Sequence, residues 1–82
     1  MKIKFSKRAA KALETLDKTT RARIIAGILG IPKGDIKPLQ GYPDGRMRLR
    51  IGKYRIVFSY MVENDEEVLY VMDAGSRGDI YK

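Results

Sequence analysis

Arginine alternates with apolar residues along segment 45–58, the part of this chain whose residue types are best suited to chemistry. The pair Gly52-Lys53 favours a two-residue hairpin turn of type II′, which would place Arg50 directly opposite Arg55. Because alternate residues of a strand share a face, the hairpin would have one apolar and one cationic face. The apolar face is expected to carry Met47, Leu49, Ile51, Tyr54, Ile56 and Phe58, and the cationic face Arg46, Arg48, Arg50 and Arg55.

The expected pairing of Arg50 with Arg55 places two like charges across from each other, which costs stability in a sheet. A fold tolerates that cost more readily if an anion binds there, and arginine's planar fork grips phosphate at two points. The chain has 17 Lys plus Arg against 10 Asp plus Glu, a net charge of +7 on 82 residues, so a polyanionic partner is expected. Alternatively, the arginines form only the solvated face of an exposed strand. Arg50 could pair with a carboxylate and carries less functional weight here than Arg48.

The composition removes several kinds of chemistry. Without cysteine there is no disulfide or thiolate zinc site, and without histidine the commonest metal ligand and acid/base group is missing. Chemistry near neutral pH must therefore use Arg, Lys, Tyr or carboxylates, and no cofactor or metal is expected. No run has the length of a membrane span, and the N-terminus lacks the apolar core of a signal peptide. A cytoplasmic protein without a membrane partner is expected.

Helical periodicity dominates the N-terminal half. Ser6 can cap a helix to about Leu16, and Thr19 or Thr20 can cap a second helix to about Leu29, where Gly30 and then a proline end it. The first helix should bury one side and the second an apolar stripe; these are Ala9, Ala10, Leu13 and Leu16, then Ala22, Ile25, Ile28 and Leu29.

The remaining segments predict a small sheet. Residues 2–5 alternate as a short strand, 31–45 read as a loop rich in proline and glycine, 62–66 as a polar turn, and 68–72 as a further strand. The order predicts one α+β domain over residues 1–82, with a two-helix hairpin on one face of a small antiparallel sheet. The other face is left to the arginines.

Four motifs carry a resemblance to a known family. They are Leu39-Gln40-Gly41, the segment 46–58 with Leu49-Arg50 and Tyr54-Arg55, the pair Ser76-Arg77, and Ile80-Tyr81. With the order of elements, they resemble the RelE/ParE toxin superfamily, and within it the RelE branch. The resemblance implies a RelE-like fold and the toxin of a type II toxin–antitoxin system. It also implies a metal-independent endoribonuclease that cuts messenger RNA in the ribosomal A site by attack of the 2′-hydroxyl.

The same resemblance assigns roles to residues of this chain. Arg55 would stabilise charge on the phosphoryl oxygens, Arg77 the leaving group, and Tyr81 would accept the proton of the 2′-hydroxyl, because neighbouring guanidinium groups favour its phenolate. The substrate-binding residues would be Arg46, Arg48 and Arg50. Judged singly, Tyr81 could instead pack at the sheet edge, and Arg77 could form a surface salt bridge with Asp73 or Asp79.

The resemblance also implies partners. A cognate antitoxin protein would cover the cationic face, the ribosome and messenger RNA would be the targets, and operator DNA would be reached only indirectly through the antitoxin. Two other readings stay open at this point. One is a ParE-like toxin that inhibits DNA gyrase, and the other is a catalytically inactive module that binds RNA or the antitoxin.

Overall fold

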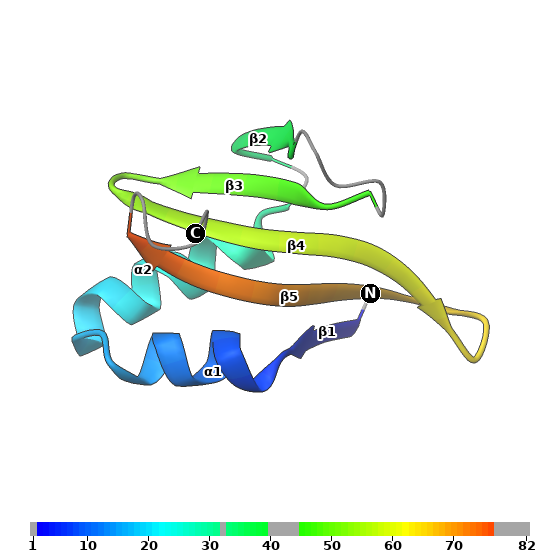
Figure 1. Ribbon diagram of the computed structural model, residues 1–82, viewed down its shortest axis with the longest axis horizontal. Helices are drawn as coiled ribbons and strands as arrows, with labels where there is room; N and C mark the ends of the chain where they lie inside the picture. The colour runs from blue at the N-terminus through cyan, green and yellow to red at the C-terminus, as the bar shows by residue number, and fades with distance from the viewer. Residues whose placement is uncertain (1, 32, 40–44, 77–82) are drawn as a thin grey trace.

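A computed structural model of the chain describes residues 2–31, 33–39 and 45–76. The elements are β1 (Lys2–Phe5), α1 (Lys7–Glu14), α2 (Lys18–Leu29), β2 (Asp35–Pro38), β3 (Met47–Ile51), β4 (Tyr54–Glu63) and β5 (Glu66–Ser76). The strands form one sheet in the order β1-β5-β4-β3-β2 (Figure 1). Strands β2 to β5 pair antiparallel, whereas β1 runs parallel to β5. The predicted α+β class is confirmed, with this one parallel pair added.

The β3–β4 hairpin has the predicted register. Arg50 pairs with Arg55, and Ile51 pairs with Tyr54. Gly52 has a φ of +59°, while Lys53 stays outside the positive-φ region, the combination that a type II′ turn requires. All six residues expected on the apolar face lie in or against the core, and they are Met47, Leu49, Ile51, Tyr54, Ile56 and Phe58.

The β4–β5 hairpin is longer than its sequence suggests. Its turn consists of Asn64 and Asp65 alone, with φ values of +51° and +62°. Asn and Asp tolerate this left-handed region, and two positive φ values in succession suit the twist of a tight hairpin. The ladder therefore continues to the pair Glu63 and Glu66, and the strand expected at 68–72 extends over Glu66–Ser76.

Side chains cap both helices at their N-termini. The Ser6 hydroxyl accepts a hydrogen bond from the Ala9 N–H (3.0 Å), as predicted for α1, although this helix ends at Glu14 rather than at Leu16. The expectation that Thr19 or Thr20 caps α2 was wrong. Asp17 is the N-cap, and its carboxylate accepts from the Thr20 N–H (3.1 Å). A charged acceptor at this position also benefits from the helix dipole.

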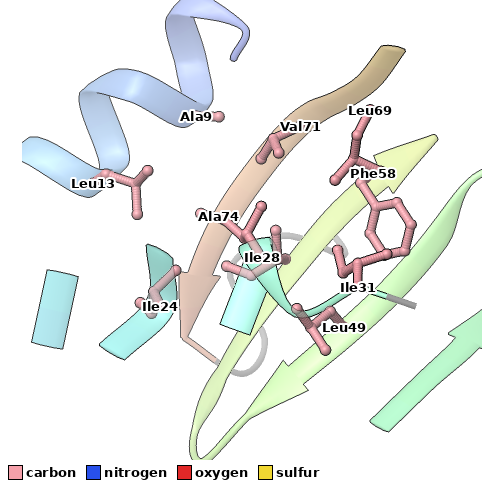
Figure 2. Packing of buried hydrophobic residues seen from close by; sticks show 11 residues of the cluster. Ala9, Leu13, Ile24, Ile28, Ile31, Leu49, Phe58, Leu69, Val71 and Ala74 are labelled. Atoms are coloured by element: carbon pink, nitrogen blue, oxygen red, sulfur yellow. The ribbon is translucent and has the colours of Figure 1, made fainter. Parts of the chain in front are cut away.

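The core lies between the helices and one sheet face (Figure 2). The predicted helix faces were partly wrong, because Ala10, Ala22 and Leu29 are exposed while Ile24 is fully buried. For α2 the physical reason is Gly27, at which a Cβ would lie 2.5 Å from the Ile51 Cδ1. The missing side chain lets α2 approach β3 closely, and the residues on that side become the buried stripe. That stripe is Ile24, Ile28 and, just past the helix, Ile31.

Strand β2 was not expected, since 31–45 was predicted to be a loop. It pairs with β3 at the sheet edge, where Pro38 lies opposite Met47. Proline is tolerated at an edge because no further strand needs its missing N–H. No helix in the described part of the chain is long and apolar enough to cross a membrane.

Candidate nucleic-acid interface

The sheet face opposite the helices carries rows of cross-strand neighbours. In one row Arg50 of β3 and Arg55 of β4 are adjacent, with Gly75 of β5 beyond them. In the next row Arg48 lies beside Val57, and Val57 lies beside Asp73. Arg46, which directly precedes β3, lines a hollow on the same face. The structure thus brings the four predicted arginines of the hairpin together, and we call the residues Arg46, Arg48, Arg50 and Arg55 the arginine face.

Arg48 of the arginine face is largely enclosed and lies near a carboxylate. Its side chain is 12% exposed, and its Nη2 lies 3.7 Å from the Asp35 Oδ1 of strand β2. Its buried Nη1 has no hydrogen-bond partner within the described residues. Asp35 is the cross-strand neighbour of Arg50, so its carboxylate reaches diagonally to Arg48. From the sequence, Arg50 was the residue expected to pair with a carboxylate, whereas in the structure the Asp35 carboxylate lies closest to Arg48.

Arg50 and Arg55 differ in their exposure. Arg50 is exposed on β3, while Arg55 is half-buried between β3 and β5. The like-charge pair predicted from the sequence is therefore present in the register. The pair places two positive charges side by side on β3 and β4. The next position in the row, on β5, is Gly75, which has no side chain. Asp35 of β2 lies on the other side of Arg50 in the same row.

A hollow of about 340 Å³ lies beside this row on the same face. Its walls come from the helix α1 start, from the segment before β3, and from β4 and β5. The lining residues are Ser6, Arg8, Leu39, Arg46, Val57, Tyr70, Met72 and Asp73. The hollow therefore combines apolar walls with two guanidinium groups, a phenol and a carboxylate.

Sequence reasoning missed Arg8, Tyr70 and Asp73. Tyr70 and Asp73 are three positions apart, and in a regular strand they would point to opposite faces. The register shifts between Val57 and Phe58, so that Asp73 pairs with Val57 while Tyr70 pairs with Ser59. This β-bulge turns both side chains to the same face, and no signal in the sequence indicates it.

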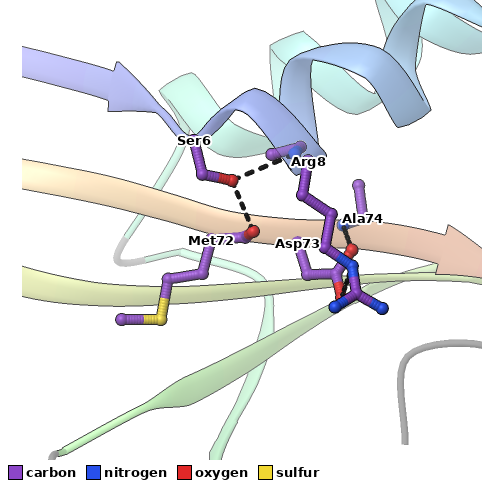
Figure 3. A network of polar contacts seen from close by, with 6 residues as sticks. Ser6, Arg8, Met72, Asp73 and Ala74 are labelled. Carbon is purple, nitrogen blue, oxygen red and sulfur yellow. Dashed lines mark hydrogen bonds and ion pairs between the residues drawn. The ribbon is translucent and has the colours of Figure 1, made fainter. Parts of the chain in front are cut away.

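Polar contacts anchor the start of α1 over the bulge (Figure 3). The Ser6 hydroxyl donates to the Met72 carbonyl (2.6 Å). The Arg8 Nε lies 3.2 Å from the Asp73 Oδ2, and the Asp73 Oδ1 accepts from the Ala74 N–H (2.9 Å). The Asp73 side chain is 16% exposed, whereas that of Arg8 is 73% exposed. The Asp73 carboxylate thus lies within the hollow, and its partner Arg8 lies mostly in solvent at the rim.

Two predicted catalytic residues, Arg77 and Tyr81, lie outside the described residues. A second hollow of about 380 Å³ is lined by Leu16, Lys53, Tyr54 and Ala74 among others, so it lies apart from the arginine face. No group of three or more His, Cys, Asp or Glu side chains that could hold a metal ion occurs in 2–31, 33–39 and 45–76.

Residues 3–81 match the sequence model of a family described as the ParE toxin of the type II toxin–antitoxin system parDE. The chain belongs to the RelE/ParE toxin superfamily. It is accordingly the toxin of a type II toxin–antitoxin system. No curated protein matches this toxin in sequence.

Solved structures of superfamily members share the fold of this toxin. A chain of the archaeal RelE–RelB complex from Pyrococcus horikoshii OT3 is 30% identical, with a TM-score of 0.68, and the match covers 95% of this chain and 96% of that one. A chain of the RelB–RelE antitoxin–toxin complex from Methanococcus jannaschii is 29% identical, with a TM-score of 0.68 and coverage of 94% and 93%. The YoeB/ParE toxin from Agrobacterium tumefaciens, at 22% identity, a TM-score of 0.70 and coverage of 94% and 99%, shows the fold alone.

Proposed function

We propose that this toxin is an endoribonuclease that cuts messenger RNA in the ribosomal A site. The observation that carries the proposal is the arginine face, where Arg48, Arg50 and Arg55 lie on adjacent strands with Arg46 beside them. Guanidinium groups at such spacing suit the phosphates of an RNA backbone. The relatives from Pyrococcus horikoshii and Methanococcus jannaschii are named RelE, which supports the RelE branch over others.

The proposed reaction needs no resident cofactor. The 2′-hydroxyl gives its proton to Tyr81, its oxygen bonds to the adjacent phosphorus, and the bond from phosphorus to the 5′-oxygen breaks. The 5′-oxygen takes up a proton from water, which leaves a 2′,3′-cyclic phosphate and a free 5′-hydroxyl. Arg55 stabilises the charge that develops on the phosphoryl oxygens, and Arg77 stabilises the leaving oxygen. The phosphates on either side are held by Arg46, Arg48 and Arg50.

A dependence on the ribosome follows from the modest acid and base groups. A guanidinium gives up its proton too reluctantly to act as a strong acid, and a phenol is a weak base near neutral pH. Much of the rate must then come from RNA that is already bent so that the 2′-oxygen, phosphorus and 5′-oxygen lie in line. A ribosome that holds the codon in this geometry would supply it.

We propose a cognate antitoxin as the resident partner. The relatives from Pyrococcus horikoshii and Methanococcus jannaschii were both solved as complexes of RelE with RelB. A segment with acidic side chains would complement the net charge of +7 and cover the arginine face. Operator DNA would be contacted through the antitoxin.

Inhibition of DNA gyrase is the second candidate, because the family model that matches residues 3–81 is that of ParE. In that case the arginine face would serve as a docking surface rather than a catalytic one. The two candidates differ in their response to the loss of Arg55. RNA cleavage requires its guanidinium, whereas gyrase inhibition is expected to be insensitive to its loss.

The test incubates the purified toxin with programmed ribosomes and, separately, with naked messenger RNA, and maps cuts by primer extension. Cuts in the A site are expected only with ribosomes, and Arg55→Ala should reduce them by about a hundredfold or more, as loss of an oxyanion donor does. Lys11→Ala removes one exposed positive charge from α1 and should leave cleavage unchanged. Intact RNA in both reactions would contradict the proposal. Inhibition of supercoiling by both wild type and Arg55→Ala would then favour the gyrase candidate.

A further inference from the structure

We propose that Asp35 of the edge strand β2 is a positioning residue, whose carboxylate holds the guanidinium group of Arg48 in the orientation in which it meets an RNA phosphate. The inference rests on the proposed function, because Arg48 is one of the phosphate-binding residues of that reaction. Asp35 itself touches no atom of the substrate. The strand that the sequence did not predict thereby acts on the reaction through its neighbour in the sheet.

Strand β2 adds two charged side chains beside the arginine face. Residues that lie opposite each other in an antiparallel pair project to the same side of the sheet. Asp35 lies opposite Arg50, and Lys37 lies opposite Arg48. Arg48 thus has a like charge directly across from it and a carboxylate at the diagonal position, which a long side chain can reach. Repulsion by Lys37 and attraction by Asp35 direct the guanidinium of Arg48 to the same place.

Burial shows which arginine the carboxylate acts on. The Arg48 side chain is 12% exposed, and its Nη2 lies 3.7 Å from the Asp35 Oδ1. Arg50, the direct neighbour of Asp35, is exposed. Charges attract each other more strongly where water is excluded, because the effective dielectric constant is lower there. The carboxylate therefore interacts more strongly with the enclosed Arg48 than its place in the register suggests.

The guanidinium of Arg48 needs such a counterion to stay where it is. Its Nη1 is buried and has no hydrogen-bond partner within the described residues. A buried donor of this kind costs free energy, which the side chain would recover by turning towards water. The contact with Asp35, at 3.7 Å, is an ion pair rather than a hydrogen bond. We infer that this attraction opposes the turn towards water.

Holding Arg48 has a benefit and a cost for RNA cleavage. A group that is fixed before the reaction needs no reorganisation when charge develops on the phosphate. The Asp35 carboxylate, however, also repels the phosphates of an approaching RNA. Asp35 should therefore raise the maximal rate of cleavage and weaken association with the substrate. A residue with a purely structural role would not weaken association in this way.

The first test measures cleavage of programmed ribosomes under single-turnover conditions, with the toxin in excess and its concentration varied. Asp35→Asn should lower the maximal rate by about tenfold, because a poorly placed group costs up to about a hundredfold. It should also lower the half-saturating toxin concentration by about twofold, since a repulsive charge is removed. Asp35→Glu keeps the carboxylate and should recover most of the rate. An unchanged maximal rate in Asp35→Asn would overturn the proposal.

The same assay has two controls. Glu67→Gln removes an exposed carboxylate elsewhere, on β5, and should change neither quantity. Asp35→Asn is then repeated in the backgrounds Arg48→Ala and Arg50→Ala. Its effect on the maximal rate should disappear in Arg48→Ala and persist in Arg50→Ala, because coupled residues are not additive. The reverse pattern would overturn the proposal, since Asp35 would then act through Arg50.

The second test needs no cleavage. Relaxation of the arginine side-chain Nε resonances in the full chain reports how firmly each guanidinium is held. Arg48 should be more ordered than the exposed Arg50, and Asp35→Asn should make the two alike. Equal mobility of Arg48 and Arg50 in the wild type would overturn the proposal even if Asp35→Asn does not fold. An ordered Arg48 that Asp35→Asn releases, together with uncut RNA on programmed ribosomes, would support the hold on Arg48 and contradict the proposed function.

Discussion

Arg50 and Arg55 face each other across β3 and β4, and Asp35 of β2 lies on the other side of Arg50. Like charges directly opposite in a sheet are destabilising, and Arg50 is exposed, so it contributes little packing in return. If Arg50 binds RNA as proposed, its side chain serves the ligand rather than the stability of the toxin. A substitution of Arg50 should therefore change the free energy of unfolding and the affinity for RNA in opposite directions.

We predict that Arg50→Thr raises the free energy of unfolding by about 0.2–1 kcal/mol, because it removes the repulsion and introduces a residue that favours strands. The same change should weaken binding of single-stranded RNA. Urea denaturation and an RNA titration measure the two effects. Arg50→Lys keeps the charge and should show no gain in stability, and a less stable Arg50→Thr would contradict the explanation.

Asp17 is a second residue with a measurable role, at the start of α2. Hydrogen bonds from the Thr20 hydroxyl and the Thr20 N–H lower the pKa of this carboxyl below its ordinary value of 3.8. A carboxyl with a lowered pKa in the folded state adds stability above its unfolded pKa, and this stability is lost as the pH falls through the folded value. We therefore predict that Asp17→Asn, which remains a good N-cap, flattens the decline of the unfolding midpoint below about pH 4. Thermal unfolding from neutral to acidic pH tests this, and an unchanged acid decline in the variant would contradict it.

At this scale the sequence predicted the arginine face but not the hollow beside it. The period of two in segment 45–58 is enough to place Arg48, Arg50 and Arg55 on one face. Asp73 and Tyr70 share that face only because of the bulge, and Arg8 reaches Asp73 from a helix far away in sequence. Such meetings depend on tertiary geometry that local periodicity does not encode. The roles of Arg77 and Tyr81 stay predictions.

The contact between α2 and β3 sets the orientation of the helix. Apolar periodicity favoured a stripe from Ala22 to Leu29, because glycine does not count as a hydrophobic residue in such patterns. The structure instead turns Gly27 towards Ile51 and buries Ile24. The edge strand β2 was missed for a related reason, since Pro38 is a turn signal everywhere except at a sheet edge. Both errors come from Gly27 and Pro38, because the structural effect of glycine and proline depends on the neighbouring strand or helix.

We predict that Gly27→Val destabilises the toxin by about 1–3 kcal/mol, because added methyl groups overpack the contact with Ile51. Gly30→Ala is the matched control. A Cβ there would meet only backbone oxygens at 3.5 Å and 3.6 Å, which is ordinary contact, so its effect should be small. Denaturant midpoints measure both variants. Equal stabilities for Gly27→Val and wild type would show that α2 does not rest on β3 in this way.

Across the whole molecule, the net charge of +7 should make the proposed association with RNA sensitive to salt. We predict that the logarithm of the affinity for single-stranded RNA falls linearly with the logarithm of salt concentration, and that each arginine removed from the arginine face lowers the slope by about 0.7. Titrations of wild type and of Arg50→Thr between about 50 and 200 mM salt measure this. Lys11→Ala should leave the slope unchanged, and an equal reduction by Lys11→Ala would mean that overall charge rather than the face governs binding.

The position of β5 has a consequence for folding of the toxin during its synthesis. This strand pairs with β1 on one side and with β4 on the other, and it is the last of the elements that the structure describes between residues 2 and 76. A chain growing from the ribosome emerges N-terminus first, so β1 waits without a partner until β5 has left the exit tunnel. Until then Asp73 cannot stand beside Val57, and the start of α1 has no bulge to bind. A nascent copy therefore completes neither its sheet nor the contacts at the start of α1 until β5 has emerged.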